Sequence, residues 1–367
     1  MNIVRSCIMA CIALVASTGI STAAVTYSIT DLGTFGGVNS VARSINNKGQ
    51  VVGWYEMADR GRNAFLYDHG SVTDLGTLGG SHTIALSINN QGQIVGRSSD
   101  RGFIYENGVM RDLTPGASSI SPTAINDNGQ VAGYGSVSLR ALVLDNGLPI
   151  DLGTPIGYYI SFAQGINNRG QLVGNYERPR LGGAETRAFL YSAGKLIDIG
   201  TLYGNAFLDV PFTSGEAIND QGQIAGRATV ANGDMHAFLY SNGLMRDLGT
   251  IGDRVSEGYS INNLGDVVGE LIKTPADRHA FIYHDGSMSD LNDLIEPNSG
   301  WTIQWALDIN DHGEIAGVGL KDGVARGIIL TPVPEPAGSL LLLASSIVIS
   351  GTRRLRFPPC NGSSTAP

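Results

Sequence analysis

The six histidines are the side chains best suited to metal binding or acid–base chemistry, but their spacing supports neither. None of them forms the His-Glu-x-x-His pattern that places two imidazoles on one helix face to hold zinc. His236 and His279 occupy equivalent positions in two copies of a repeat, so we expect both to have a structural role. The full set is His69, His82, His236, His279, His284 and His312.

Carboxylates recur in two patterns. Asp220-Gln221-Gly222 and Asp311-His312-Gly313-Glu314 are superficially similar to calcium loops, but they lack the alternating acids and the distal Glu of such loops. Four sister copies carry Asn at the same position, so this turn does not need a charge. An Asp-Leu-Gly mark, varied in a few copies, also recurs, and we expect its Asp to bond a turn amide in every unit. The mark occurs at Asp31, Asp74, Asp112, Asp151, Asp198, Asp247 and Asp290.

Candidate binding side chains lie where the repeats depart from one another, between the second and third strands expected in each unit. The longest departure, 175–187, contains Glu177, Arg178 and Arg180, which a glycosidase or lyase could use. The sequence contains no Gly-x-Ser-x-Gly elbow, phosphate loop or dinucleotide fingerprint. We therefore predict no catalytic, cofactor-binding or metal residue. Aromatic residues that could stack on sugars are Trp54, Tyr55, Tyr158, Tyr159, Trp301 and Trp305.

The elements that must position these residues come from a sevenfold repeat. The phrase Ile-Asn-Asn/Asp-x-Gly-Gln/Asp/Glu begins at Ile45, Ile88, Ile125, Ile166, Ile218, Ile261 and Ile309, with spacings of 43, 37, 41, 52, 43 and 48 residues. Asn and Gly tolerate the left-handed backbone of tight turns, so each phrase predicts a strand-turn-strand hairpin. Small alternate residues just before the phrase, such as Ala42 and Ser44, predict strands crowded near an axis.

A second hairpin completes each unit. Its first strand has the form of Ala64-Phe65-Leu66-Tyr67, and its last strand ends in the Asp-Leu-Gly mark. Four strands in about 40 to 45 residues is the size of one propeller blade. The first such last strand, Tyr27 to Gly33, precedes the first whole unit, while the seventh unit stops near Leu330. We therefore expect an all-β, seven-bladed propeller over 25–330, closed by its N-terminal strand, rather than a capped linear solenoid.

The N-terminus predicts export. Arg5, an apolar stretch and the small residues Ser21 to Ala24 form a secretory signal over 1–24, in preference to a buried first strand. All three cysteines, Cys7, Cys11 and Cys360, lie near the ends, so the body holds no disulfide. With the four arginines near the ends left out, 33 acids face 20 bases, a net charge of −13. That charge disfavours nucleic acid as a partner.

The C-terminus, 331–356, closely resembles the PEP-CTERM sorting signal of exopolysaccharide-producing Gram-negative bacteria. The matching parts, in order, are Val333-Pro334-Glu335-Pro336, an apolar stretch from Ala337 to Gly351, and Arg353, Arg354 and Arg356. The resemblance implies Sec export, transient inner-membrane contact through a C-terminal helix, and recognition by an exosortase. Such tails usually end soon after the arginines, whereas 357–367 continues as an expected disordered tail. The alternative is an ordinary membrane anchor, although fifteen residues are short for a span.

The body resembles the HAF-repeat extracellular proteins, through His236-Ala237-Phe238 and His279-Ala280-Phe281 with their flanking Asp-Leu-Gly and Asn-Asn-x-Gly elements. That resemblance implies an extracellular protein of undefined activity and supplies no catalytic residue. We expect a secreted or cell-surface, non-catalytic scaffold associated with exopolysaccharide, with polysaccharide or a surface protein as its partner. The alternative is a polysaccharide-active glycosidase or lyase on a propeller scaffold.

Overall fold

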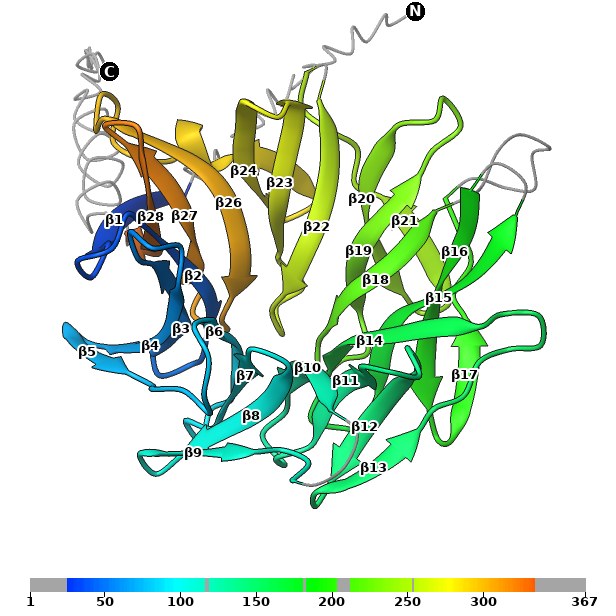
Figure 1. The fold of residues 1–367 in the computed structure, drawn as a ribbon. Helices are drawn as coiled ribbons and strands as arrows, with labels where there is room; N and C mark the ends of the chain where they lie inside the picture. The colour runs from blue at the N-terminus through cyan, green and yellow to red at the C-terminus, as the bar shows by residue number, and fades with distance from the viewer. Residues whose placement is uncertain (1–24, 116–118, 181–182, 203–211, 253, 334–367) are drawn as a thin grey trace, which may run out of the picture. The chain divides into compact units, whose positions relative to one another are not determined.

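The fold is a ring of antiparallel four-stranded sheets, seen in a computed structural model that describes residues 25–115, 119–180, 183–202, 212–252 and 254–333 (Figure 1). The compact unit is Thr26–Val333. It contains seven sheets, each with its strands in sequence order apart from the closing sheet, so the predicted seven-bladed propeller is confirmed. No helix among these residues is long and apolar enough to cross a bilayer.

Each blade runs from an inner to an outer strand. Blades 1 to 3 consist of β2(Asn39–Ile45), β3(Val51–Glu56), β4(Arg62–Asp68), β5(Ser71–Asp74), then β6(Thr83–Ile88), β7(Ile94–Ser98), β8(Arg101–Glu106), β9(Val109–Asp112), then β10(Ile120–Ile125), β11(Val131–Gly135), β12(Ala141–Asp145), β13(Leu148–Asp151). Blades 4 to 6 consist of β14(Ile160–Ile166), β15(Leu172–Arg180), β16(Gly183–Ser192), β17(Lys195–Asp198), then β18(Thr213–Ile218), β19(Ile224–Thr229), β20(Met235–Ser241), β21(Leu244–Asp247), then β22(Val255–Ile261), β23(Val267–Thr274), β24(Asp277–His284), β25(Ser287–Asp290).

Blade 7 closes the ring. It contains β26(Trp301–Ile309), β27(Ile315–Lys321), β28(Val324–Val333) and, outermost, β1(Thr26–Gly33). β1 pairs antiparallel with β28 from Thr26↔Val333 to Asp31↔Ile328, which confirms the predicted closure. β28 extends three residues beyond the predicted boundary at 330, because the eight-residue β1 continues the ladder that far. The start of the predicted tail, 331–333, is therefore strand.

The small-faced strand of each blade is innermost, since the first strands of neighbouring blades lie against one another all round the ring. Ala42 and Ala85 on these strands are fully buried. The second strand approaches equally closely: a Cβ on Gly53 would lie 1.9 Å from the carbonyl oxygen of Val41. A bulge interrupts the inner hairpin of every blade, as between Ala42 and Ser44. The predicted crowding near the axis is thus confirmed.

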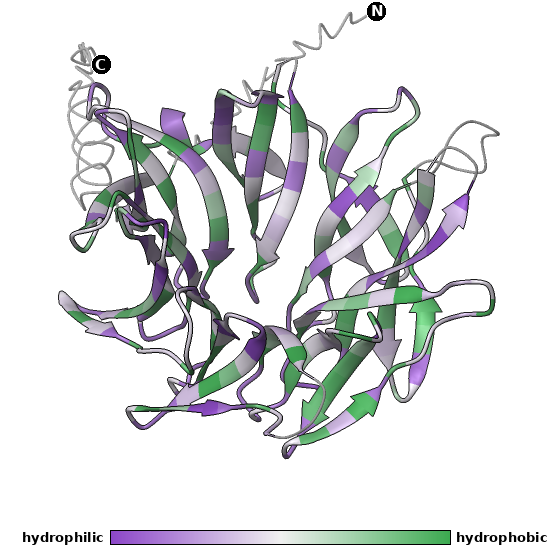
Figure 2. Ribbon diagram, viewed as in Figure 1, coloured by the Kyte–Doolittle hydropathy of each residue, from purple (hydrophilic) through white to green (hydrophobic). Residues whose placement is uncertain are grey.

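The core lies between blades and is built from the repeated third strand. Its aromatic ring is fully buried at Phe65, Phe103, Phe189, Phe238 and Phe281. Figure 2 shows apolar and polar residues alternating along many of the strands. In one such cluster Phe65 packs with Leu32 of β1 and Ile329 of β28, so the closing strand shares a core with blade 1.

Candidate functional site

The first Asn of each repeated phrase forms a closed ring of hydrogen bonds around the axis. Its side-chain amide donates to the backbone carbonyl of the equivalent Asn in the next blade, at 2.9 to 3.2 Å, and blade 7 donates back to blade 1. The same side chain bonds its own turn: Oδ1 of Asn167 accepts from the N–H groups of Arg169 and Gln171, and its amide also reaches Gln171 Oε1. The ring residues are Asn46, Asn89, Asn126, Asn167, Asn219, Asn262 and Asn310, all buried.

The second Asn or Asp of the phrase forms a parallel ring. In each blade its backbone N–H donates to Oδ1 of the next blade's residue at 2.8 to 2.9 Å, which explains why Asn and Asp interchange here. The three acids Asp127, Asp220 and Asp311 are never neighbours in this ring. Burial raises the pKa of Asp311, but hydrogen bonds from Asn263 and Asn47 outweigh it, and the net shift is downward.

The two rings surround a polar cavity of about 190 Å³ on the axis, also lined by the isoleucines of the phrase. Asp220 and Asp311, the residues of the calcium-like sequences, are used in the second ring. Within the described ranges, no three His, Cys, Asp or Glu side chains converge as metal ligands would. The repeated polar phrase is therefore explained by closure of the ring.

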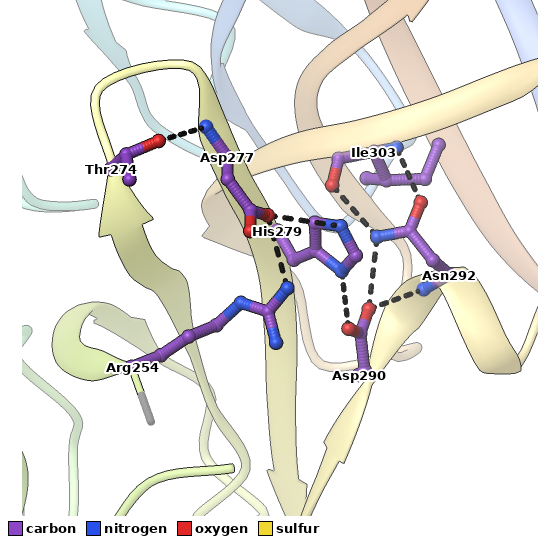
Figure 3. Close-up of polar contacts among 7 residues, drawn as sticks. All are labelled: Arg254, Thr274, Asp277, His279, Asp290, Asn292 and Ile303. Atoms are coloured by element: carbon purple, nitrogen blue, oxygen red, sulfur yellow. Dashed lines mark hydrogen bonds and ion pairs between the residues drawn. The ribbon is translucent and has the colours of Figure 1, made fainter. Parts of the chain in front are cut away.

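The Asp of every Asp-Leu-Gly mark accepts a hydrogen bond from the backbone N–H two residues later, at 2.7 to 2.9 Å, as predicted. In six blades the carboxylate also pairs with the Arg or His that precedes the Ala or Gly of the third strand, whereas Asp74 accepts from the Tyr55 hydroxyl. Figure 3 shows this for His279, whose Nδ1 lies 2.5 Å from Asp290 Oδ2. His236 pairs with Asp247 in the same way, and Arg187 with Asp198. Both repeat histidines thus join strands within their own blade.

One histidine gives the ring a pH-dependent contact. In blade 6 Asp266 replaces the Gln of the phrase, and its carboxylate lies 2.6 Å from Nδ1 of His284. The hydrogen bond to Asp266 raises the pKa of His284 despite burial. A raised folded-state pKa stabilises the protein fully below the unfolded value of about 6.5, and the stabilisation is lost as the pH rises through the folded value.

We therefore expect the thermal midpoint of the wild type to fall more between pH 5.5 and 8.5 than that of His284→Gln. Thermal unfolding followed by circular dichroism at both pH values measures the difference. His82→Gln is the matched control, because His82 is exposed and its Nδ1 contacts the Ser81 hydroxyl rather than a carboxylate. Equal pH dependence in the wild type and His284→Gln would contradict the assignment.

Residues that differ between blades form a second kind of contact, across blade boundaries. The residue after the second-strand glycine meets a residue of the next inner strand: Tyr134 packs edge-on against Phe162 at 4.9 Å, and Trp305 donates to Glu270 at 2.7 Å. Ser214 and Asn175 form a third pair at 3.4 Å. Complementary pairs of this kind serve blade-to-blade packing.

The most charged of these contacts joins blades 5 and 6. Arg227 lies between Glu216, at 3.3 Å, and Glu257, and the Tyr259 hydroxyl touches both Glu257 and Glu270. Burial and the adjacent carboxylates raise the pKa of Tyr259. Burial would lower the pKa of Arg227, but Glu216 and Glu257 raise it overall. Arg227 thus separates Glu216 from Glu257, and the Tyr259 hydroxyl lies between Glu257 and Glu270.

The predicted insertion in blade 4 is mostly strand: β15 and β16 continue to Arg180 and from Gly183. Glu185 is almost fully buried and forms ion pairs with Arg178 at 2.7 Å and Arg180 at 2.5 Å. It also accepts a hydrogen bond from the Tyr158 hydroxyl at 3.1 Å. Burial raises the pKa of Glu185, but these partners lower it overall. Arg178 and Arg180 are therefore tied to the hairpin, and Glu177 is bonded by Asn175.

The hairpins between second and third strands share one face with the loops that link blades, which we name the loop face. Backbone bonds such as Arg62 N–H to Ser81 C=O and Ser136 N–H to Ser119 C=O join them. These two groups of loops therefore lie on one face of the ring.

The loop face carries four exposed apolar side chains on two loops at the junction of blades 3 and 4. Val137 and Leu139 lie on one loop, and Ile156 and Tyr159 on the next, with exposed fractions of 82%, 37%, 103% and 68%. The backbone holds both loops: Ser161 N–H donates to Leu139 C=O, and Tyr159 N–H to Glu177 C=O. Tyr158 packs against Tyr176 at 4.5 Å and anchors the second loop. We name these four residues the loop-face patch.

The other candidate aromatics are occupied differently. Arg62 covers the Trp54 ring at 4.3 Å, and Tyr55 is buried with its hydroxyl donating to Asp74. Trp301 lines a pocket beside β1. Of the predicted sorting residues, Val333 ends β28, while Pro334, Glu335, Pro336, Arg353, Arg354 and Arg356 lie outside the described residues.

The fold and these contacts define a seven-bladed β-propeller, and solved propellers are similar to it. The chain is 11% identical to a puromycin-hydrolysing peptidase of Mycobacterium tuberculosis, with a TM-score of 0.53, over 81% of this chain and 51% of that one. It therefore spans about half the length of that peptidase. The propeller domain of the Trilobed protease of Pyrococcus furiosus is 13% identical, with a TM-score of 0.49, over 71% of this chain and 86% of that domain.

No family model matches the chain, and no match was found among curated proteins. At these identities the similarity to solved structures shows the fold alone. Of the loop-face patch, the sequence singled out Tyr159 as an aromatic that could stack on sugars, but it missed Val137, Leu139 and Ile156. It also missed the interblade pairs, because their partners are far apart in the chain and differ from blade to blade.

Proposed function

We propose that this propeller is an exported, non-catalytic scaffold of the cell surface or extracellular matrix, and that the loop-face patch binds a protein partner. The repeated Asp, Asn and His residues are used in holding the ring and its blades together. The loop-face patch is the observation that carries the proposal, because four exposed apolar side chains on fixed loops contribute little to packing. Aliphatic side chains with one tyrosine suit a protein surface better than a sugar, which stacks on flat aromatic rings.

Export and surface placement rest on the resemblance of the chain's ends to a secretory signal and a PEP-CTERM sorting signal, and of the body to HAF-repeat proteins. A net charge of −13 without the terminal arginines keeps such a scaffold soluble until it meets its partner. The loops are fixed before binding, so little ordering entropy is lost on association.

The test is retention in the extracellular matrix of the host bacterium. We expect the double variant Ile156→Asp/Tyr159→Asp to be exported at the wild-type level but to lose at least about tenfold in retention, since two apolar contacts at an interface centre contribute more than about 1.4 kcal/mol. Immunoblots of the matrix and medium fractions measure this. Leu148→Asp is the matched control, because Leu148 is 70% exposed on the outer strand β13. Equal retention of the double variant would contradict the proposal.

A second candidate function is cleavage of extracellular polysaccharide, as a glycosidase or a lyase. It is favoured by one observation, the contact of Glu257 and Glu270 with the same Tyr259 hydroxyl. Paired carboxylates are the general acid and base of glycosidases. Here Arg278 and Trp305 also bind Glu270, and Arg227 binds Glu257, so both carboxylates are engaged in structure. Turnover of the host polysaccharide that disappears in Glu257→Gln would favour this candidate.

A further inference from the structure

A pocket of about 610 Å³ lies beside the closing strand, away from the loop-face patch. One wall is β1, from Thr26 to Ile29, and the other is the segment 295–301 that leads into blade 7. The Tyr27 N–H donates to Leu294 C=O at 2.8 Å and holds the two walls together. The volume of this pocket is within the range of pockets that bind small ligands.

The walls combine an aromatic face with hydroxyl-bonding groups. The Trp301 ring packs directly against the backbone of Gly319, where an added Cβ would lie 2.7 Å from the ring. Lys321 Nζ lies 5.0 Å from the ring centre. Pro297 continues the apolar surface, while Glu296 and Ser299 supply a carboxylate and a hydroxyl. A sugar ring has a matching shape, with a C–H face that stacks on an indole and hydroxyls around its edge.

The backbone of β1 adds a donor and an acceptor. The Tyr27 N–H points away from β28, toward Leu294. Alternate residues of an antiparallel strand direct their backbone groups to the same side, so the N–H and C=O of Ile29 also face away from β28. Ile29 lines the pocket, and both groups are therefore positioned for sugar hydroxyls.

The charge of the pocket indicates which class of sugar it can bind. Glu296 is the only Asp, Glu, Lys or Arg among its described lining residues, and burial, with the charge of Asp266, raises the pKa of Tyr27 to about 12. A lone carboxylate accepts hydroxyl protons but repels a second anion. Glu296 therefore disfavours a uronic acid or a sulfated sugar, and Lys321 Nζ, 5.0 Å from the Trp301 ring centre, is not among the lining residues, so we take the ligand to be neutral.

We propose that this pocket binds a neutral hexose unit of a polysaccharide. This goes beyond the loop-face function, because it places a second site at the seam of the ring and makes the protein a bridge between a protein and a glycan. A sugar held between β1 and segment 295–301 joins the closing strand to the segment beside it. Binding therefore favours the closed ring.

The test is calorimetric titration and thermal unfolding of the exported protein with methyl β-D-glucoside and methyl β-D-galactoside, up to 50 mM. We expect saturable binding of at least one and a rise in Tm of about 2 °C. Glu296→Gln is expected to weaken affinity at least about fivefold through loss of charge-assisted hydrogen bonds. Asp293→Asn, three residues away and outside the lining, is the matched control and should change affinity less than about twofold.

Trp301→Phe keeps an aromatic ring in place and should also weaken binding, with folding checked by an unchanged spectrum. No saturable binding of either glycoside, or binding unchanged in both Glu296→Gln and Trp301→Phe, overturns the proposal. Binding lost in Tyr159→Ala but kept in Glu296→Gln also overturns it, and assigns the sugar to the loop-face patch instead. Loss of matrix retention in the loop-face variant with intact glycoside binding leaves both sites standing.

Discussion

Replacing Asn167 by aspartate is expected to lower the free energy of unfolding by about 4 kcal/mol. The change removes both amide protons, so the Asn219 carbonyl and Gln171 Oε1 lose their donor at 2.9 Å. It also places a carboxylate against those two oxygens at a site only 3% exposed. Unsatisfied buried groups and an unpaired buried charge each cost more than an ordinary hydrogen bond contributes. Urea unfolding followed by tryptophan fluorescence measures the change.

The control for this experiment is Asp127→Asn, one position further along the phrase in the preceding blade. Its Oδ1 keeps the bond from the Asn90 N–H, and sister blades already carry Asn at this place. The loss is limited to the contacts of Oδ2, so we expect about 1 kcal/mol. If the two variants lose equal stability, the amide hydrogen bonds of the first ring do not stabilise the contact between blades.

Replacing Arg227 by methionine is expected to cost about 2–4 kcal/mol. The change leaves Glu216 and Glu257 without their shared cation while keeping the apolar stem of the side chain. Removing one partner of a buried ion pair costs about 3–5 kcal/mol. We expect a smaller value because the Arg227 side chain is 30% exposed. Chemical denaturation of the single variant gives the cost.

Two comparisons test this interpretation. Adding Glu216→Gln and Glu257→Gln to Arg227→Met should recover at least half of the lost stability, because the uncompensated charges are then gone. Arg97→Met is the matched control: Arg97 follows the second-strand glycine of blade 2, and no ion pair joins it to another described residue. We expect that variant to lose less than about 1 kcal/mol. A triple variant no more stable than Arg227→Met would count against a charge network.

The sequence predicted the ring and its closure because both depend on local patterns that recur. Seven hairpin phrases and the displaced first strand were enough to place β1 beside β28. The role of Asp290 was also predictable, since an Asp two residues before a turn amide bonds it locally. The sorting residues beyond Val333 stay a prediction, as they lie outside the described residues.

The remaining features depend on contacts between blades, which no local pattern encodes. Asn167 reads in the sequence only as a turn former, and its amide finds Asn219 fifty-two residues away once the ring is closed. The interblade pair Arg227–Glu257 differs from its counterparts, so repetition gives no signal for it. The loop-face patch likewise depends on where the fold leaves Ile156 and Tyr159 in solvent.

The amide ring has one direction: every blade donates to the blade that follows and accepts from the one before. A duplicated or deleted unit therefore adds or removes one donor and one acceptor together, and the circuit stays balanced at any copy number. Duplication of a whole unit in the gene therefore keeps every hydrogen bond of the amide ring. Only the unlike interblade pairs, such as Tyr134 with Phe162, would meet a wrong neighbour. The order of the blades is therefore specified by those pairs rather than by the repeated phrase.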